Sequence, residues 1–226
     1  MVISEGSRIS VPMQRGGARR SHGRTPTRRF RSLTSGLEGP RLNDQITTAP
    51  SHGPAYDDPS FIIDAYRDWV SPNMKNEVVL PYVSMHGSTY EMVMHLIDSL
   101  AAKDVAVYAF DLAVTDIGKL AIALVDAATL IVGTPTVHVG PHPAVYQAAH
   151  LANLLRPKVR HAAIVGSYGW SSKAIEQISA LIPNLNVDVL GAFLHKGRPD
   201  EKTFAELDGL ATSVARAHAE DELVTV

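Results

Sequence analysis

From Glu77 onward, the chain alternates five short apolar runs with five longer segments of helical periodicity. The apolar runs read as strands: EVVLPYV, DVAVYAFD, TLIVGT, HAAIVGS and VDVLGAF. The segment after the first run, TYEMVMHLIDSLAAK, is typical of a helix because Met92, Leu96 and Leu100 fall on one face. A parallel connection between strands requires a crossover, so this alternation predicts an α/β fold with a parallel sheet. Near-continuous apolar runs indicate strands that are covered by helices on both faces.

The natural closure of this pattern is a flavodoxin-like, doubly wound, five-stranded parallel sheet of order 2-1-3-4-5, with helices on both faces. We assign this domain to residues 76–220. Before it, residues 46–75 contain a loop rich in Pro, Gly, Ser and Asp, one short helix in FIIDAYRDWV and a linker, SPNMKN.

Residues 1–45 carry nine Arg, no Lys and only three acidic residues, in a chain whose formal net charge is −2. Few aliphatic residues and no periodicity favour a disordered Arg-rich arm. The alternative is a sequence-independent phosphate binder that attaches the protein to nucleic acid. We rank nucleic acid as the weaker interpretation.

The composition excludes several classes of protein. With zero cysteines, the chain has no disulfide framework, thiolate metal site or cysteine nucleophile. It has no run of 18 or more apolar residues, and its first residues lack the apolar core of a secretory signal. We therefore expect a cytoplasmic protein that does not span a membrane.

Three loops follow the first, third and fourth apolar runs, and they are rich in glycine, proline and hydroxyl residues: SMHGST, GTPTVHVGPHP and GSYGWSS. Ligands of doubly wound sheets bind beyond the carboxyl ends of the strands, at the topological switch point. Because these loops leave the strands at that edge, we expect them to converge on one site.

The first loop, SMHGST, enters a helix and favours an anion site. A helix N-terminus presents N–H groups without intrahelical partners and a positive partial charge, both suited to a phosphate. Ser84, Ser88 and Thr89 add hydroxyl donors, and Gly87 permits close backbone approach. The alternative is ordinary helix capping by Ser88 or Thr89. This segment alone leaves both interpretations open.

The third loop places Tyr168 and Trp170 on either side of Gly169, and the second loop offers Thr134 and Thr136 for hydrogen bonding. Exposed aromatic side chains at a strand-end loop suit a ligand with a flat ring. The chain lacks GxxxxGK[ST] and GxGxxG, which disfavours nucleoside triphosphate and dinucleotide sites. A phosphate held without a cation, next to a stacked ring, fits FMN best.

Residues 77–219 resemble the flavodoxin domain of flavodiiron proteins, also called A-type flavoproteins. The resemblance lies in YVSMHGSTYEM, VGTPTVHVGPHP and VGSYGWSSKA, which occur in the family's order and spacing. It implies that the first loop holds the FMN phosphate, the second borders the ring and ribityl chain, and the third covers the flavin. The cofactor-binding residues that it implies are Ser84, Met85, His86, Gly87, Ser88, Thr89, Pro135, Thr136, Val137, His138, Gly140, Ser167, Tyr168, Gly169 and Trp170.

Two residues depart from the family pattern. His86 stands where the family often has an aromatic residue, and Val139 replaces a usual Asn. We expect these changes to alter the redox potential rather than to prevent FMN binding.

The resemblance extends backwards to residues 46–75, which look like the closing segment of the family's metallo-β-lactamase-like iron domain. His52 matches the last iron ligand of that domain, but the chain has no HxExDH run, so His52 is an orphan and no metal site is expected. His138 and His142 have an H-x₃-H spacing, but they lie in a Gly/Pro loop without nearby partners, which disfavours zinc.

The resemblance implies an FMN-binding electron-transfer protein, the flavin half of a flavodiiron-type oxygen or nitric oxide reductase. Di-iron reductase activity is not expected from this chain alone, and no catalytic residue is assigned. Expected partners are a redox protein or reductase and, in a homodimer, a second copy of the chain. The alternatives are a non-catalytic interaction module with this fold or an inactive truncated fragment.

Overall fold

The computed structural model describes residues 55–223, which divide between Ser71 and Pro72 into two compact units. The described part of the first unit contains helix α1 (Pro59–Val70), as the periodicity of FIIDAYRDWV predicts. Asp58 caps this helix by accepting a hydrogen bond from the backbone N–H of Ser60 at 3.0 Å. No residue of α1 is buried. The Arg-rich arm and His52 lie outside the described residues.

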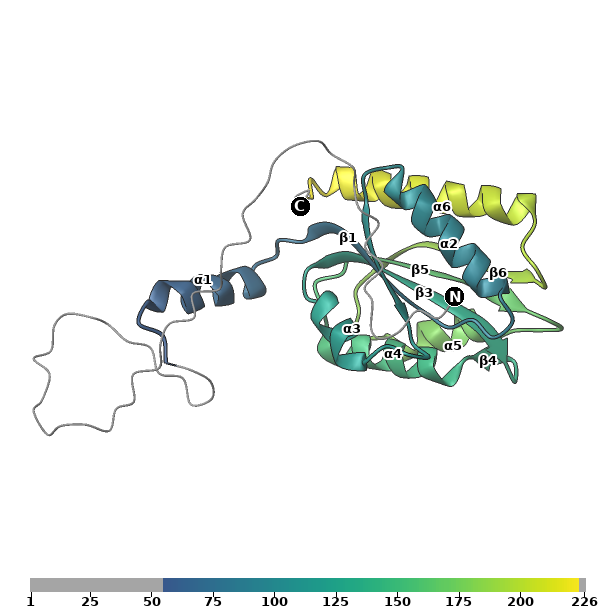
Figure 1. Cartoon of the computed structure of the whole chain (residues 1–226), viewed down its shortest axis with the longest axis horizontal. Helices are drawn as coiled ribbons and strands as arrows, with labels where there is room; N and C mark the ends of the chain where they lie inside the picture. Colours follow the sequence, from purple (N-terminus) through teal and green to yellow (C-terminus); the bar gives the residue numbers. More distant parts are fainter. Residues whose placement is uncertain (1–54, 224–226) are drawn as a thin grey trace, which may run out of the picture. The chain divides into compact units, whose positions relative to one another are not determined.

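The second unit is built on a parallel sheet, which confirms the predicted architecture (Figure 1). Its long strands lie in the spatial order β2-β1-β3-β5-β6, which is the predicted order 2-1-3-4-5 when only the long strands are numbered. The strands are β1 (Lys75–Tyr82), β2 (Ala106–Asp111), β3 (Ala127–Val137), β5 (His161–Tyr168) and β6 (Asp188–Lys196).

Five helices cover the two faces of this sheet (Figure 1). Helices α2 and α6 lie on one face, and α3, α4 and α5 lie on the other. None of the helices in residues 55–223 is both long and apolar enough to cross a membrane. The bounds are α2 (Ser88–Ala101), α3 (Ile117–Ala123), α4 (Pro143–Leu155), α5 (Ala174–Leu181) and α6 (Glu201–Glu220).

Each face of the sheet has its own apolar core because successive strand residues point to opposite faces. Val78 and Leu80 of β1 pack in the core beneath α2 and α6, whereas Val79 packs in the core on the other face. All three side chains are fully buried. The near-continuous apolar character of the strands is therefore explained by helices on both sides.

The sequence pattern did not predict the end of β3. We expected a strand that stops at Thr134, but β3 continues to Val137 and then folds back as a two-residue strand, β4 (Gly140–Pro141). The two strands pair antiparallel, with Val137 opposite Gly140. Apolar periodicity could not predict this hairpin because the paired segment is only two residues long on each strand.

The hairpin turn has a conformation that its residues do not favour. His138 and Val139 occupy the two positions between the paired residues, with φ angles of 47° and 73°. Two consecutive positive φ angles are typical of a type I′ turn, which favours Asn-Gly. A β-branched residue at positive φ is uncommon. Val139 therefore adopts a strained conformation, at a position where an Asn would be tolerated better.

The strands also approach each other closely where they reach the site. Thr134 of β3 lies opposite Gly166 of β5. A Cβ atom on Gly166 would lie 1.9 Å from the Thr134 carbonyl oxygen. Only glycine fits this position. Because Gly166 has no side chain, the second and third loops can leave the sheet close together.

Candidate functional site

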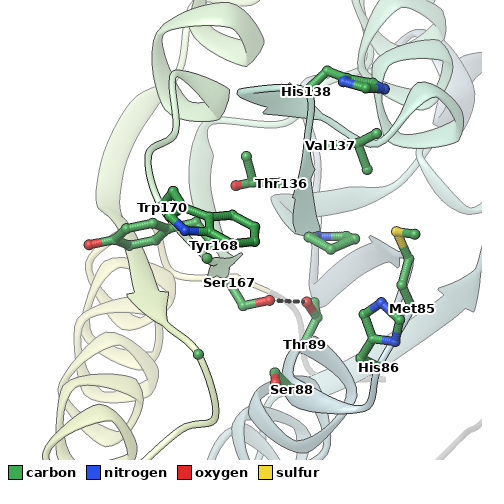
Figure 2. A pocket seen from close by; sticks show the side chains of 13 residues that line it. Met85, His86, Ser88, Thr89, Thr136, Val137, His138, Ser167, Tyr168 and Trp170 are labelled. Carbon is green, nitrogen blue, oxygen red and sulfur yellow. Dashed lines mark hydrogen bonds between the residues drawn. The ribbon is translucent and has the colours of Figure 1, made fainter.

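The loops that follow β1, β3 and β5 surround one cavity of about 400 Å³ at the carboxyl edge of the sheet. Figure 2 shows Met85 and His86 from the first loop on one side and Tyr168 and Trp170 from the third loop on the other. The cavity lies at the β1/β3 switch point because β1 is followed by a helix on one face and β3 by a helix on the other. The predicted convergence of the three loops is therefore present in the structure.

The first loop turns sharply into α2 at Gly87, whose φ angle is +90°. Ser84 caps this helix, because its Oγ accepts a hydrogen bond from the backbone N–H of Tyr90 at 3.1 Å. The N–H groups of Ser88 and Thr89 begin the helix, where no intrahelical acceptor exists. Both residues line the cavity, so the helix N-terminus faces the space that a ligand would fill.

The second loop is held in place through two threonine hydroxyls. The Thr134 Oγ1, which is buried, accepts a hydrogen bond from the backbone N–H of His142 at 3.0 Å and donates to the Pro135 carbonyl at 2.8 Å. The Thr136 hydroxyl donates to Ser172 Oγ at 2.8 Å. These bonds fix the wall of the cavity that consists of residues 135–138.

The third loop is joined to both of the others. Its Ser167 hydroxyl lies 3.1 Å from the hydroxyl of Thr89, a contact drawn as a dashed line in Figure 2. Ser172 Oγ, which accepts from Thr136, also caps α5 by accepting the Ala174 N–H at 3.1 Å. The cavity wall is therefore one hydrogen-bonded assembly rather than three independent loops.

Trp170 differs from the other residues of the cavity because its side chain packs against almost nothing. The residue is 96% exposed although it lines the cavity. An indole left in water at the rim of a cavity is available to cover a ligand or a partner surface.

The structure places most of the predicted site residues around the cavity. Twelve of the fifteen line it: Met85, His86, Ser88, Thr89, Pro135, Thr136, Val137, His138, Ser167, Tyr168, Gly169 and Trp170. Their binding roles stay predictions. The other three, Ser84, Gly87 and Gly140, support the loops instead of lining the cavity.

Gly140 shows why a predicted contact residue can be a supporting one. It pairs with Val137 in the β3–β4 hairpin, and a Cβ at Gly140 would lie 2.3 Å from the Gln177 side-chain oxygen of α5. The glycine therefore lies against the Gln177 side chain, and a larger residue would require that side chain to move. The backbone N–H of Lys173 also donates to the Val139 carbonyl at 2.6 Å, which ties the start of α5 to the strained turn.

Sequence reasoning missed Gly197, which lines the cavity from the loop between β6 and α6. Its backbone N–H donates to the Tyr168 carbonyl at 2.9 Å. The signal was available, because the loop after the last strand leaves the sheet at the same edge as the other three. Ser172 was also missed, since its role depends on contacts between two loops.

The lining residues carry no fixed charge. None of the thirteen is Lys, Arg, Asp or Glu, and only His86 and His138 can become cationic. Beneath the site, burial raises the pKa of Tyr82 to about 12, with smaller contributions from the negative charge of Asp111 and from Tyr90. Tyr82 therefore stays neutral, and an anion in the cavity would rely on N–H and hydroxyl donors.

Residues 55–223 contain no group of three or more His, Cys, Asp or Glu side chains that could hold a metal ion. His138 and His142, which have zinc-like spacing, have different local roles. His138 lines the cavity, whereas the Nδ1 of His142 accepts the Ala144 N–H at 3.2 Å and so caps α4.

No family model matches the chain. Among curated proteins, the chain is 30% identical over 142 residues to an uncharacterised protein of Methanocaldococcus jannaschii, covering 62% of this chain and 36% of that protein. It is 36% identical over 129 residues to a nitric oxide reductase of Moorella thermoacetica, covering 57% of this chain and 32% of that protein. The chain thus spans about a third of the length of these relatives.

Solved structures show the same fold. Rubredoxin oxygen:oxidoreductase from Desulfovibrio gigas matches with a TM-score of 0.74 and 24% identity, over 79% of this chain and 45% of that protein. An archaeal flavodoxin matches with a TM-score of 0.53 and 22% identity, over 62% of this chain and 97% of the flavodoxin. The α/β unit is a flavodoxin-like domain, similar in sequence to part of a nitric oxide reductase and in fold to part of flavodiiron proteins.

Proposed function

We propose that this chain binds FMN in the cavity at the carboxyl edge of the sheet and transfers electrons through it. The observation that carries the proposal is the convergence of three loops on one cavity that combines a helix N-terminus with an exposed indole. In flavodoxin-like folds, FMN lies at the switch point between the first and third strands. This cavity has that position.

The donors of the first loop suit the phosphate of FMN. The N–H groups of Ser88 and Thr89 and the hydroxyl of Ser88 lie at the start of α2, where the helix dipole favours an anion. The Thr89 hydroxyl also contacts Ser167 and so holds the first loop against the third. The phosphate would therefore be bound by neutral donors that the fold positions.

The remaining walls suit the isoalloxazine ring. Met85, Pro135 and Val137 supply apolar surface, and Tyr168 and Trp170 supply aromatic surface on the facing side (Figure 2). When bound, FMN would supply the redox chemistry, and the protein would position its ring and tune its potential. The residues of this chain would bind, orient and partly shield the ring from water.

We further propose that the chain is the flavin half of a flavodiiron-type oxygen or nitric oxide reductase. The sequence match to part of a nitric oxide reductase of Moorella thermoacetica, 36% identical over 129 residues, supports this proposal.

A redox protein or reductase would exchange electrons with this site, and a second copy of the chain is the other proposed partner. The indole of Trp170 is exposed at the rim of the cavity, where a partner protein could contact it. We keep the cytoplasm as the proposed location.

Titration of the purified full chain with FMN tests the proposal. We expect one FMN per chain, quenching of flavin fluorescence and retention of the yellow cofactor on a desalting column. Reduction by dithionite under argon, followed by reoxidation with a one-electron acceptor, tests electron transfer. An intact fold by circular dichroism that binds no FMN would favour the non-catalytic interaction module instead.

A further inference from the structure

An ion pair stands beside the cavity and is not explained by the binding of the ring. Arg198 Nε lies 3.1 Å from Glu91 Oε2, and Arg198 Nη2 lies 3.0 Å from Glu91 Oε1. This is the bidentate fork that arginine forms with a carboxylate. The Arg198 side chain is 79% exposed and that of Glu91 36% exposed, so the pair lies at the surface.

The position of Glu91 places its charge close to the proposed phosphate donors. Glu91 belongs to the first turn of α2, three residues after Ser88, and residues with this spacing share one helix face. Side chains on a helix also tilt toward its N-terminus. The Glu91 carboxylate therefore lies near the end of the helix where the anion is proposed to bind.

Arg198 reaches this carboxylate from the loop between β6 and α6. It directly follows Gly197, which lines the cavity and donates its N–H to the Tyr168 carbonyl. The pair thus links the β6–α6 loop to the first turn of α2. The third loop is joined to the β6–α6 loop as well, through the hydrogen bond between Gly197 and Tyr168.

The ion pair resolves an electrostatic conflict. An acid in the first turn stabilises a helix through its dipole, but the same acid repels an anion bound at that end. No Lys or Arg is among the residues that line the cavity in the described part of the chain. The cation that compensates Glu91 is Arg198.

We propose that Arg198 is a positioning residue that neutralises Glu91 and so allows the site to accept a phosphorylated flavin. This inference rests on the proposed FMN site and deepens it, since it names a determinant of selectivity for FMN over riboflavin. Arg198 does not need to touch the phosphate for this role. Its effect comes from removing the repulsion between Glu91 and a phosphate that carries a charge of about −1.5 to −2.

The charge model makes opposite predictions for the two partners. Arg198→Gln leaves Glu91 uncompensated, so FMN binding should weaken by roughly fourfold at 10 mM salt and about twofold at 150 mM, taking a separation of roughly 8 Å in water. Glu91→Gln leaves a cation beside the site, so FMN binding should strengthen by a similar factor. The double variant should bind FMN like the wild type.

Riboflavin separates this effect from a structural one, because it carries the same ring without the phosphate. We expect the affinity for riboflavin to change by less than about 1.5-fold in all three variants, because riboflavin has no phosphate that could interact with the altered charge. Arg216→Gln is the matched control. Arg216 pairs with Glu220 at 75% exposure, but it lies roughly 22 Å along α6 from the start of that helix.

The experiment is a set of FMN and riboflavin titrations at 10 mM and 150 mM salt on full-length wild type, the three variants and the control. Opposite, salt-dependent shifts for FMN alone support the inference. Weaker binding of both FMN and riboflavin in both single variants would overturn the inference, because the ion pair would then act only by holding the two loops together. Wild-type protein that binds neither flavin refutes the proposed function itself. Thermal melts confirm folding, and a surface pair should contribute little to stability.

Discussion

His218 of α6 is buried in a polar cluster at the amino ends of the strands, at the edge of the sheet opposite the cavity. Its Nε2 lies 2.6 Å from the Thr129 hydroxyl of β3, and its Nδ1 lies 2.7 Å from Asn76 Oδ1 of β1. The ring of His161, the first residue of β5, is 6.1 Å away between centroids. This cluster attaches the last helix to three strands.

The hydrogen bonds determine the neutral form of this imidazole. Asn76 Nδ2 donates to the Asp104 carbonyl at 2.9 Å, so its Oδ1 is the acceptor that faces His218. His218 therefore donates from Nδ1 and accepts the Thr129 hydroxyl at Nε2. Burial, with a smaller contribution from the neighbouring His161, lowers the pKa of His218 from 6.5 to about 4, and the negative charge of Asp221 opposes this shift.

The magnitude follows from proton linkage. Between pH 6.5 and about 4, the unfolded chain binds a proton at this histidine, whereas the folded chain does not. The stability from neutral His218 is thus fully present above pH 6.5 and is lost as the pH falls toward 4. Each pKa unit is worth about 1.4 kcal/mol, so the lowered pKa of His218 removes about 3 kcal/mol from the free energy of unfolding once the pH has fallen to about 4.

Urea unfolding of the FMN-free protein between pH 4.5 and 7.5 measures this loss, with His218→Gln as the reference. The wild type should lose about 2.5 kcal/mol more than the variant across this window, because the rest of the loss falls below pH 4.5. Asp126 and Asp221 do not interfere because their pKa values are lowered below 3.8 by hydrogen bonds and ion pairs, so they act below about pH 4. If the two curves stay parallel within about 0.5 kcal/mol, the linkage argument is wrong.

Three further predictions concern the cavity. Trp170→Ala should weaken FMN binding about tenfold and remove most of the tryptophan quenching on binding, with unfolding free energy unchanged within about 0.5 kcal/mol because the side chain is exposed. Wild-type affinity and quenching in this variant would show that the indole does not cover the flavin. Ser88→Asp should abolish FMN retention through dialysis while the circular dichroism spectrum is preserved, since it places a negative charge against the phosphate. Retained FMN would contradict the phosphate assignment. Val139→Gly should be about 1 kcal/mol more stable to urea than Val139→Ala, because only glycine relieves the positive φ, and equal midpoints would argue against strain in the turn.

The alternation of strands and helices was predictable from local patterns, and the strand order and the position of the site followed from the usual closure of such a sheet. Each long strand is an apolar run because both of its faces are buried, and each helix shows its own periodicity. Since parallel strands all end at one edge, knowing which loops follow them was enough to bring the loops of Ser88, Thr136 and Trp170 together. These properties depend on short stretches of chain, which a sequence displays directly.

Only the tertiary structure decided which side chains face the cavity and which support it. The Ser84 hydroxyl is of the kind that could donate a hydrogen bond to a ligand, yet it caps α2. Arg198 and Glu91 are 107 residues apart in sequence, and no periodicity predicts that they meet beside the site. Asn76 and His218, 142 residues apart, meet at the opposite edge. Such pairs depend on the register of packed elements and the direction of individual side chains, which arise only when the whole domain has folded.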